Sequence, residues 1–167
     1  MSFFLPTLCK KRVSEITPPL LRKMGIRGIL LDVDNTLSTH GSQQPLPAAL
    51  SWTRELSGLG IKLMIISNNH KERVEPFAAQ FSLPFLYDAK KPMSKGFSKA
   101  SEELGIPKEE LLVVGDQIFT DILGANLSGI RSVLLEPIEL EKGFFFRVKR
   151  WMERPFLHRM EKRLPRG

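Results

Sequence analysis

Carboxylate, hydroxyl and ammonium side chains follow several short apolar runs of this 167-residue chain. Asp32 and Asp34 close the first of these runs, Ser67 follows the second and Asp116 a later one, and Lys91 comes after a short run between them. If the runs are strands of an open parallel sheet, functional groups gather outside their carboxyl ends. These five side chains are therefore expected to meet along one edge of the sheet.

Such a set of side chains suits the transfer of a phosphoryl group. The carboxylates of Asp32 and Asp116 form a hard oxygen site of the kind that Mg²⁺ prefers, and this ion commonly keeps some waters and accepts a substrate phosphate. Lys91 and the metal would offset charge on the phosphoryl group, while Ser67 and nearby backbone amides hold its oxygens. Asp32 could then attack phosphorus and form an aspartyl-phosphate. Without a cation or donors, two carboxylates at the end of a buried strand would be costly.

The elements that must position these residues are read from hydrophobic periodicity. Apolar runs, which predict strands, occur at 29–33, 61–66, 83–86, 111–114 and 130–135. Stretches with helical periodicity separate them, at 46–58, 71–81, 94–104 and 119–127, and a short helix is expected at 20–24. The strands are too apolar to face water. The alternation predicts an α/β fold, with a doubly wound parallel five-stranded sheet covered by helices on both faces.

Four ordered motifs in this chain resemble those of the haloacid dehalogenase (HAD) superfamily. They are Asp32-Val-Asp34-Asn-Thr36, Ser67, Lys91-Pro92 and Gly115-Asp116-Gln-x-x-Thr-Asp121. Each lies at the end of a predicted strand, and agreement between motif and predicted structure is what makes the set specific. The resemblance spans about residues 26–136 and implies a HAD-like Rossmannoid core there.

The resemblance implies a role for each matching acidic residue. Asp32 would be the nucleophile and a metal ligand, and Asp116 a second metal ligand. Asp34 would be the general acid and base, and it would also lend a backbone carbonyl to the metal. A carboxyl group two residues after the nucleophile can protonate the leaving alkoxide and then activate water, so the chain is expected to be a hydrolase. Thr36 would stabilise the loop. Asp121 would contact the residues that bind the metal, or would contact the metal through a water.

The phosphate contacts are expected from Ser67, Asn68 and Lys91. Lys90 is an alternative to Lys91, but the lysine of the family directly precedes proline, as Lys91 does. The segment from Ser67 to Asn69 could instead cap the helix that follows it.

The spacing of the motifs leaves no room for a cap domain. Asp32 and Ser67 are 35 positions apart, and Ser67 and Lys91 are 24 positions apart. These lengths are used up by one loop, the predicted helices and the strands, so the site should be open to a large substrate. His40 and His70 lie near the predicted edge and could touch a substrate, although a lone histidine more often has another role.

The net charge of +7 is unevenly distributed. Residues 1–27 carry six Lys/Arg and one acid, and residues 144–167 carry eight and two, whereas residues 28–143 carry eleven and fifteen. We therefore predict a basic N-terminal flank over 1–25 and a basic amphipathic tail over 137–167 that meet an anionic surface.

A phospholipid membrane suits that anionic surface, because basic helices with aromatic residues bind bilayer interfaces. The alternative is a tail that packs on its own core or on a second copy of the chain. Nucleic acid is a poorer fit, since the positive charge lies at the ends rather than around the predicted site. No run is long enough to cross a membrane.

The whole chain is similar to the subfamily IIIA phosphatases, which include phosphatidylglycerophosphate phosphatases of bacteria and organelles. This resemblance implies a Mg²⁺-dependent enzyme that converts phosphatidylglycerophosphate to phosphatidylglycerol, bound peripherally to the inner, cytoplasmic face of the membrane. The only cysteine, Cys9, cannot form an internal disulfide, which fits a reducing compartment. The alternatives are a soluble phosphatase for a small phosphometabolite, a non-enzymatic phospho-receiver module and a membrane-binding scaffold.

Overall fold

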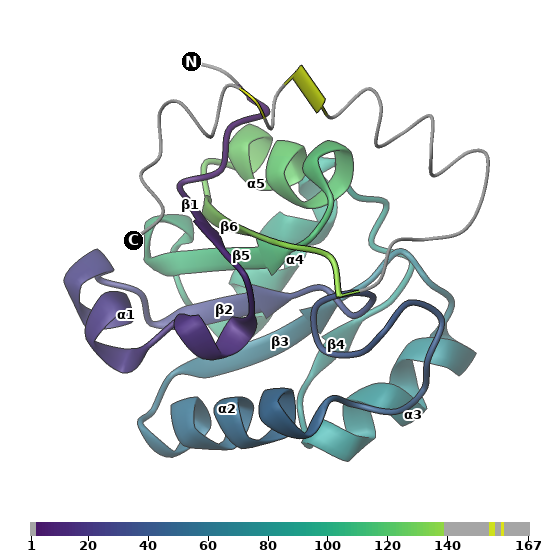
Figure 1. Ribbon diagram of the computed structural model, residues 1–167. Helices are drawn as coiled ribbons and strands as arrows, with labels where there is room; N and C mark the ends of the chain where they lie inside the picture. Colours follow the sequence, from purple (N-terminus) through teal and green to yellow (C-terminus); the bar gives the residue numbers. More distant parts are fainter. Residues whose placement is uncertain (1–2, 139–153, 156–157, 159–167) are drawn as a thin grey trace.

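Six parallel strands form one sheet in the computed structural model, which describes residues 3–138, 154–155 and 158 (Figure 1). Their order across the sheet is β1-β6-β5-β2-β3-β4, and every neighbouring pair is parallel. The strands are β1 (Leu8–Lys10), β2 (Gly28–Leu31), β3 (Lys62–Ile66), β4 (Phe85–Leu86), β5 (Leu111–Gly115) and β6 (Arg131–Leu135). The predicted α/β fold with a parallel sheet is confirmed.

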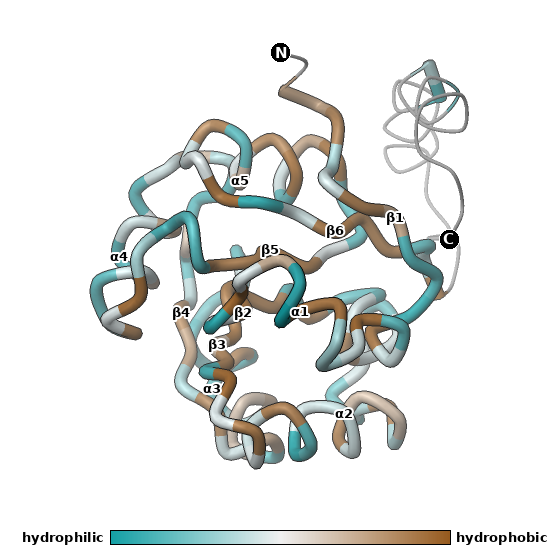
Figure 2. The backbone as a smooth tube through the Cα atoms, turned by 90° about the vertical axis from the view of Figure 1, so that its left-hand side faces the viewer, coloured by the Kyte–Doolittle hydropathy of each residue, from teal (hydrophilic) through white to brown (hydrophobic). Residues whose placement is uncertain are grey.

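Helices cover both faces of the sheet. The first face carries α1 (Pro18–Met24), α2 (Pro47–Gly58) and α3 (Lys71–Phe81), and the second carries α4 (Ser94–Leu104) and α5 (Leu123–Ser128). The connecting turns include the 3₁₀ turns η1 (Val13–Glu15) and η2 (Lys108–Glu110) and the π-helical turn η3 (Ile118–Ile122). Figure 2 shows the apolar strands running between the two groups of helices.

The apolar runs of the sequence are explained by this double cover. In β2, Ile29 and Leu31 pack with α2 and α3, whereas Leu30 between them packs with α4. A parallel strand whose two faces are both buried has no position for a polar residue, so its sequence is a continuous apolar run. The carboxyl ends of the strands are where polar residues become possible.

The sheet has a sixth strand, where the sequence predicted five. β1 comes from the predicted N-terminal flank and pairs with β6 at the edge of the sheet, with Leu8 opposite Val133 and Lys10 opposite Leu135. The residues after it also join the core, since Ile16 is buried and its carbonyl accepts a hydrogen bond of 2.9 Å from Trp52 Nε1. The first 25 residues therefore contribute a strand, a turn and α1 to the sheet domain.

The predicted basic tail over 137–167 lies outside the described residues, apart from 137–138, 154–155 and 158. In the part of the chain that the structure describes, no helix combines the length and hydrophobicity needed to cross a bilayer.

Candidate active site

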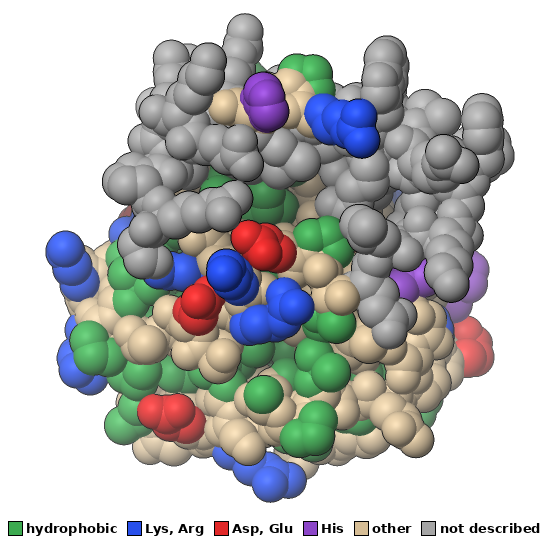
Figure 3. Space-filling model, viewed as in Figure 1, with side chains coloured by type: hydrophobic (Ala, Val, Ile, Leu, Met, Phe, Trp, Pro, Cys, Tyr) green, Lys and Arg blue, Asp and Glu red, His purple; other side chains and the backbone are tan. Residues whose placement is uncertain are grey.

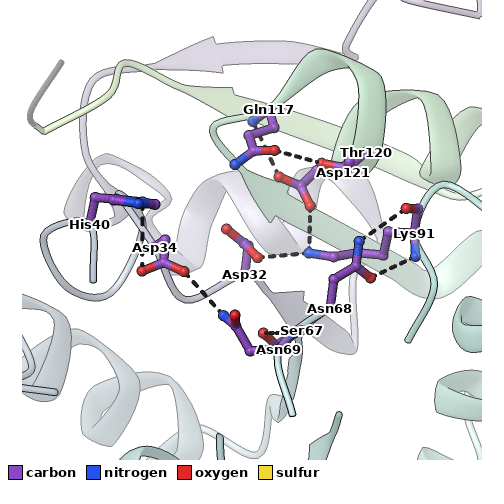
Figure 4. Close-up of polar contacts among 10 residues, drawn as sticks. All are labelled: Asp32, Asp34, His40, Ser67, Asn68, Asn69, Lys91, Gln117, Thr120 and Asp121. Atoms are coloured by element: carbon purple, nitrogen blue, oxygen red, sulfur yellow. Dashed lines mark hydrogen bonds and ion pairs between the residues drawn. The ribbon is translucent and has the colours of Figure 1, made fainter. Parts of the chain in front are cut away.

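Three neighbouring strands bring the predicted site residues to one edge of the sheet. Asp32 and Asp34 follow β2, Ser67 follows β3 and Asp116 follows β5, and β2 lies between the other two strands. Lys91 enters from the turn between β4 and α4 (Figure 4). Groups that are up to 84 positions apart in the chain therefore share one edge.

Three carboxylates form the centre of the site. Asp32, Asp116 and Asp121 each offer one oxygen, and these oxygens lie within 4.8 Å of one another. Hard oxygen ligands of this kind suit Mg²⁺, which reduces the repulsion between clustered carboxylates when it binds. The donor set therefore fits the predicted metal. Asp121, which was expected to contact the metal only indirectly, is a member of the cluster itself. The carboxylate of Asp34 lies outside the cluster.

Lys91 bridges two of these carboxylates. Its Nζ lies 2.7 Å from Asp32 Oδ1 and 2.7 Å from Asp121 Oδ1, and its side chain is only 3% exposed. Burial alone would lower the pKa of Lys91, but the charges of Asp121 and Asp32 outweigh it and raise the pKa. The lysine is therefore a fixed positive charge beside the candidate nucleophile.

Asp32 is largely shielded from solvent, with its side chain 13% exposed. Burial raises the pKa of Asp32 to about 7, and the charge of Asp121 acts in the same direction, while Lys91 opposes both. A cation bound by the cluster would favour the ionised form, which is the form that can attack phosphorus.

Asn68 fixes the backbone of Lys91. Its Oδ1 accepts a hydrogen bond of 2.7 Å from Lys91 N, and its Nδ2 donates one of 3.0 Å to Lys91 O. The side-chain amide thus links the end of β3 to the turn that carries the lysine. In this arrangement Asn68 positions Lys91, and a direct contact between Asn68 and phosphate stays a prediction.

Ser67 is buried at the end of β3, and its Oγ accepts a hydrogen bond of 3.1 Å from Asn69 N. The N-cap of α3 is His70, which makes no side-chain capping bond. The alternative in which Ser67 to Asn69 cap this helix is therefore not what the structure shows. Ser67 lies at the carboxyl edge, and among the described residues its hydroxyl hydrogen has no acceptor, so it can be donated to a bound group.

Asp34 has its own set of partners, separate from the acidic cluster. Its Oδ1 accepts hydrogen bonds of 2.9 Å from Gly41 N and 2.8 Å from Arg73 Nη2, and its Oδ2 accepts one of 3.3 Å from Asn69 Nδ2. His40 Nδ1 lies 3.9 Å from the same Oδ1. The carboxyl group predicted to transfer protons is thus held by fixed donors.

Arg73 is a candidate functional residue that the sequence analysis missed. It lies in the first turns of α3, and besides its contact with Asp34 its Nη1 donates a hydrogen bond of 3.2 Å to Gly41 O. The guanidinium therefore ties the loop after β2 to α3. In the sequence, Arg73 is one of several charges on an amphipathic helix, and no local pattern separates it from a solvated residue.

The remaining predicted residues lie around this centre. Thr36 is buried in the loop after β2, where its backbone N–H donates a hydrogen bond of 3.2 Å to Val33 O, consistent with a role in shaping the loop. Lys90 has an unusual positive φ of 54° and is exposed, unlike Lys91. His70 Nδ1 lies 3.0 Å from Asp88 Oδ1 at the surface.

Comparison with known proteins agrees with this geometry. The model of the haloacid dehalogenase-like hydrolase family matches residues 38–129, a segment that includes Ser67, Lys91 and Asp116. The probable phosphatase YqeG of Bacillus subtilis (strain 168) is 37% identical over 161 residues, which cover 96% of this chain and 94% of that protein. This chain belongs to the haloacid dehalogenase-like hydrolases. The resemblance read from the four motifs is thus confirmed at the level of the family.

More distant relatives of this HAD-like hydrolase are plant and algal proteins. Phosphatidylglycerophosphate phosphatase 1, chloroplastic/mitochondrial, of Arabidopsis thaliana is 28% identical over 168 residues, and these cover 94% of this chain. The match covers 48% of the Arabidopsis protein, so this chain spans about half of that relative's length. Among solved structures, an uncharacterized protein from Listeria monocytogenes serotype 4b has a TM-score of 0.58 at 19% identity, covering 71% of this chain and 85% of that one. That likeness shows a shared fold.

Proposed function

We propose that this HAD-like hydrolase is a Mg²⁺-dependent phosphatase that cleaves phosphomonoesters through an aspartyl-phosphate on Asp32. The observation that supports it most directly is the group formed by Asp32, Asp116, Asp121 and Lys91, in which one ammonium contacts two carboxylates at 2.7 Å. An anionic group that enters this site meets a lysine, and a nucleophilic carboxylate lies beside that lysine.

The residues of the chain divide the reaction between them. Asp32, Asp116 and Asp121 would hold Mg²⁺, which when bound draws charge from the phosphoryl oxygens. A carboxylate oxygen of Asp32 attacks phosphorus, the bond from phosphorus to the ester oxygen breaks, and Asp34 donates a proton to the leaving alkoxide. Lys91 and the hydroxyl of Ser67 stabilise charge on the phosphoryl oxygens in this step.

The second half of the cycle releases phosphate. Asp34, now ionised, takes a proton from a water that attacks phosphorus, and the bond from phosphorus to Asp32 breaks. Inorganic phosphate and free Asp32 result. The fixed donors around Asp34 from Gly41 and Arg73 keep its carboxyl group in one place for both proton transfers.

We further propose phosphatidylglycerophosphate as the substrate and phosphatidylglycerol as the product. The names of the Arabidopsis relative and of a Chlamydomonas reinhardtii relative, 26% identical over 147 residues, support this lipid. Support also comes from the short spacing of the motifs, which leaves the site open, and from the basic ends of the chain. Attraction between these ends and anionic lipid would hold the enzyme peripherally on the inner, cytoplasmic face of a membrane.

The test compares phosphate release from phosphatidylglycerophosphate in mixed micelles with release from soluble phosphomonoesters, with Mg²⁺ or EDTA. We expect faster turnover of the lipid and a loss of activity on both substrates in Asp32→Asn. Faster turnover of a soluble ester would favour an enzyme for a small phosphometabolite. Absence of turnover on any ester, with a stable phosphoryl group on Asp32, would favour a phospho-receiver.

A further inference from the structure

Parallel pairing places a basic segment on the same edge of the sheet as the candidate active site. β1 ends at Lys10, which lies opposite Leu135 of β6, and the neighbouring residue Leu134 lies opposite Gly115 at the end of β5. Lys10, and Lys11 directly after it, are therefore level with the strand ends that carry the acidic cluster. Figure 3 shows Lys and Arg side chains, with acidic side chains beside them, over the turn that follows β1.

The distance between this basic segment and the site follows from the strand order. β1 and β2 are separated by three strand spacings of about 4.8 Å, so Lys10 lies on the order of 14 Å from the strand that directly precedes Asp32. This separation is nearly twice the screening length of about 8 Å at physiological salt, so the basic segment acts on an anionic surface at its own position rather than inside the site. A flat anionic surface placed across the carboxyl edge of the sheet would contact both the basic segment and the mouth of the site.

The local charge of this segment is positive. Lys10, Lys11 and Arg12 are accompanied by two acids. The pKa of Glu15 is lowered by the hydrogen bond from Lys11 N and by the charges of the two lysines, and Glu136, which is exposed, donates a backbone hydrogen bond of 3.1 Å to Lys10 O. Arg12 Nη1 donates hydrogen bonds to Lys11 O at 2.6 Å and to Glu136 O at 3.2 Å, so its guanidinium also has a structural role. We therefore vary the two lysines, which leaves the contacts of the Arg12 guanidinium in place.

Large exposed apolar side chains lie on the other side of the site, on the same edge. Tyr87 directly follows β4 and is 45% exposed, and Met93 directly precedes α4 and is 62% exposed. β4 and β1 are the two outer strands of the sheet, so the site lies between the basic segment and these two residues. Met93 is only two positions from Lys91, and its N–H donates a hydrogen bond of 2.9 Å to Lys90 O.

We propose that the carboxyl edge of the sheet is the surface with which this protein docks on an anionic lipid bilayer. Lys10 and Lys11 bind lipid phosphates on one side of the site, and Tyr87 and Met93 enter the headgroup region on the other. The mouth of the site then faces the bilayer, and a headgroup phosphate can reach Asp32 without leaving the membrane. The benefit of this orientation, with the site facing the bilayer, rests on the proposed function. The docking itself can be measured without any substrate.

The charged half of the surface is tested by co-sedimentation with vesicles of phosphatidylcholine, with and without phosphatidylglycerol, in EDTA. The variant is Lys10→Gln/Lys11→Gln, and the control is Arg22→Gln/Lys23→Gln, which removes two exposed cations from the last turn of α1 at the opposite edge. Since a lysine near an anionic surface strengthens binding up to about fivefold, we expect a loss of about fivefold or more in the variant and less than about twofold in the control.

The apolar half is tested with the same vesicles at a high salt concentration, where charge attraction is screened. Tyr87→Ser/Met93→Ser should bind more weakly than wild type, whereas Leu59→Ser, at a residue that is 58% exposed beyond the end of α2 on the opposite edge, should not. Melting temperatures within a few degrees of wild type verify that all variants are folded.

Three outcomes would overturn the proposed surface. If Lys10→Gln/Lys11→Gln and its control Arg22→Gln/Lys23→Gln lose equal affinity for vesicles, only the net charge matters. If the lysine variant and the Tyr87→Ser/Met93→Ser variant both bind like wild type, the membrane contact lies elsewhere. If the wild-type protein does not bind anionic vesicles, there is no docking. None of these results depends on turnover. Conversely, an enzyme that docks as described but hydrolyses only soluble esters would refute the lipid substrate and leave the surface intact.

Discussion

The candidate nucleophile occupies a position that disfavours its own charge. Asp32 is almost buried, and the carboxylate of Asp121 lies nearby, so Lys91 offsets the repulsion only in part and the pKa of Asp32 is raised to about 7. A buried charge that is incompletely compensated lowers the stability of the fold. The site is thus arranged to bind a cation and an anion together rather than to stabilise the protein alone.

A first prediction is that Asp32→Asn stabilises the metal-free protein. The pKa of Asp32 is about 7 in the fold, whereas an unfolded Asp has a pKa of about 3.9. Between these values the unfolded chain loses the proton first, so the penalty grows as the pH rises and is complete above about pH 7. We expect a melting temperature a few degrees above wild type at pH 8 in EDTA, and no difference near pH 4.

The control for this experiment is Glu55→Gln, which removes an exposed acid from α2. Its melting temperature should follow that of the wild type at each pH, because an exposed carboxylate is screened by water. If Asp32→Asn is less stable than wild type at pH 8, the contact with Lys91 outweighs the cost of burial, and this account of the site is wrong.

A second prediction at the scale of single residues concerns Arg73. Since its guanidinium holds both Asp34 and the Gly41 carbonyl, Arg73→Ala should leave the proton-transferring carboxyl group misplaced. We expect kcat to fall by about 10- to 100-fold with KM within about threefold, because misplacement of about 1 Å can have effects of that size. Steady-state kinetics with a soluble phosphomonoester measure this.

Two further variants separate positioning from general loss of charge. Arg73→Lys should keep an intermediate kcat, because an ammonium can bind Asp34 but cannot bridge to Gly41 in the same fork geometry. Arg54→Ala removes an exposed arginine from α2 and should leave both constants unchanged. A change of KM alone in Arg73→Ala would instead indicate that this residue binds substrate.

At the scale of the elements, hydrophobic runs and helical periodicity were enough to predict the central sheet. The predicted helix at 71–81 agrees with α3, and the one at 94–104 agrees with α4. The motifs were read correctly as strand ends because buried parallel strands leave polar residues only there. β1 was missed because it is a three-residue, half-buried edge strand in a basic segment, and its pairing with β6 bridges more than 120 positions of the chain.

The site could be predicted in part for the same reason. Residues carried by strand ends, such as Asp32 and Asp116, were found from local sequence. The contact between Arg73 and Asp34 depends on how the loop after β2 folds over α3, which no periodicity encodes. The entry of Asp121 into the acidic cluster depends on the π-helical turn η3, which a short sequence pattern does not reveal.

The junction between β5 and η3 gives a third prediction. A Cβ on Gly115 would clash with Asp121 Oδ2, and that oxygen also accepts a hydrogen bond of 3.2 Å from Gln117 N. Asp121 cannot yield easily because its other oxygen contacts Lys91. Gly115→Ala should therefore displace Asp121, weaken binding of Mg²⁺ and lower kcat by about tenfold or more, as measured by the Mg²⁺ dependence of turnover.

Gly58→Ala is the matched control for that substitution. A Cβ on Gly58, at the end of α2, would meet no atom within 4 Å. Alanine has the higher helix propensity, so this variant should be as stable as wild type or slightly more stable, with unchanged Mg²⁺ dependence. A fully active Gly115→Ala enzyme would show that Asp121 is not needed in the cluster.

At the scale of the whole molecule, the two basic ends differ in their relation to the sheet. The N-terminal segment is part of the domain through β1, whereas the tail follows the core in sequence after β6. Residues 144–167 carry eight Lys/Arg and two acids. We predict that their deletion weakens binding to anionic vesicles and reduces its salt dependence, as measured by sedimentation across a salt series. Unchanged sedimentation would remove the tail from the membrane contact.

The acidic cluster couples the stability of the whole domain to Mg²⁺. Two of its three carboxylates follow β2 and β5 and the third lies in η3, so an ion that binds only when these elements are assembled stabilises the folded state over the unfolded chain. At about 100 times the dissociation constant this amounts to about 2.7 kcal/mol, or a rise in melting temperature of about 5–10 °C for a domain of this size.

Thermal melts against Mg²⁺ concentration at neutral pH measure this coupling without any substrate. Asp116→Asn should retain the fold but lose most of the Mg²⁺-dependent rise, because one of three charged ligands is gone. Asp88→Asn removes an exposed carboxylate that pairs with His70 and should keep the full rise. If the wild type and both variants respond equally, the ion acts at the surface, and the three carboxylates do not form a metal site.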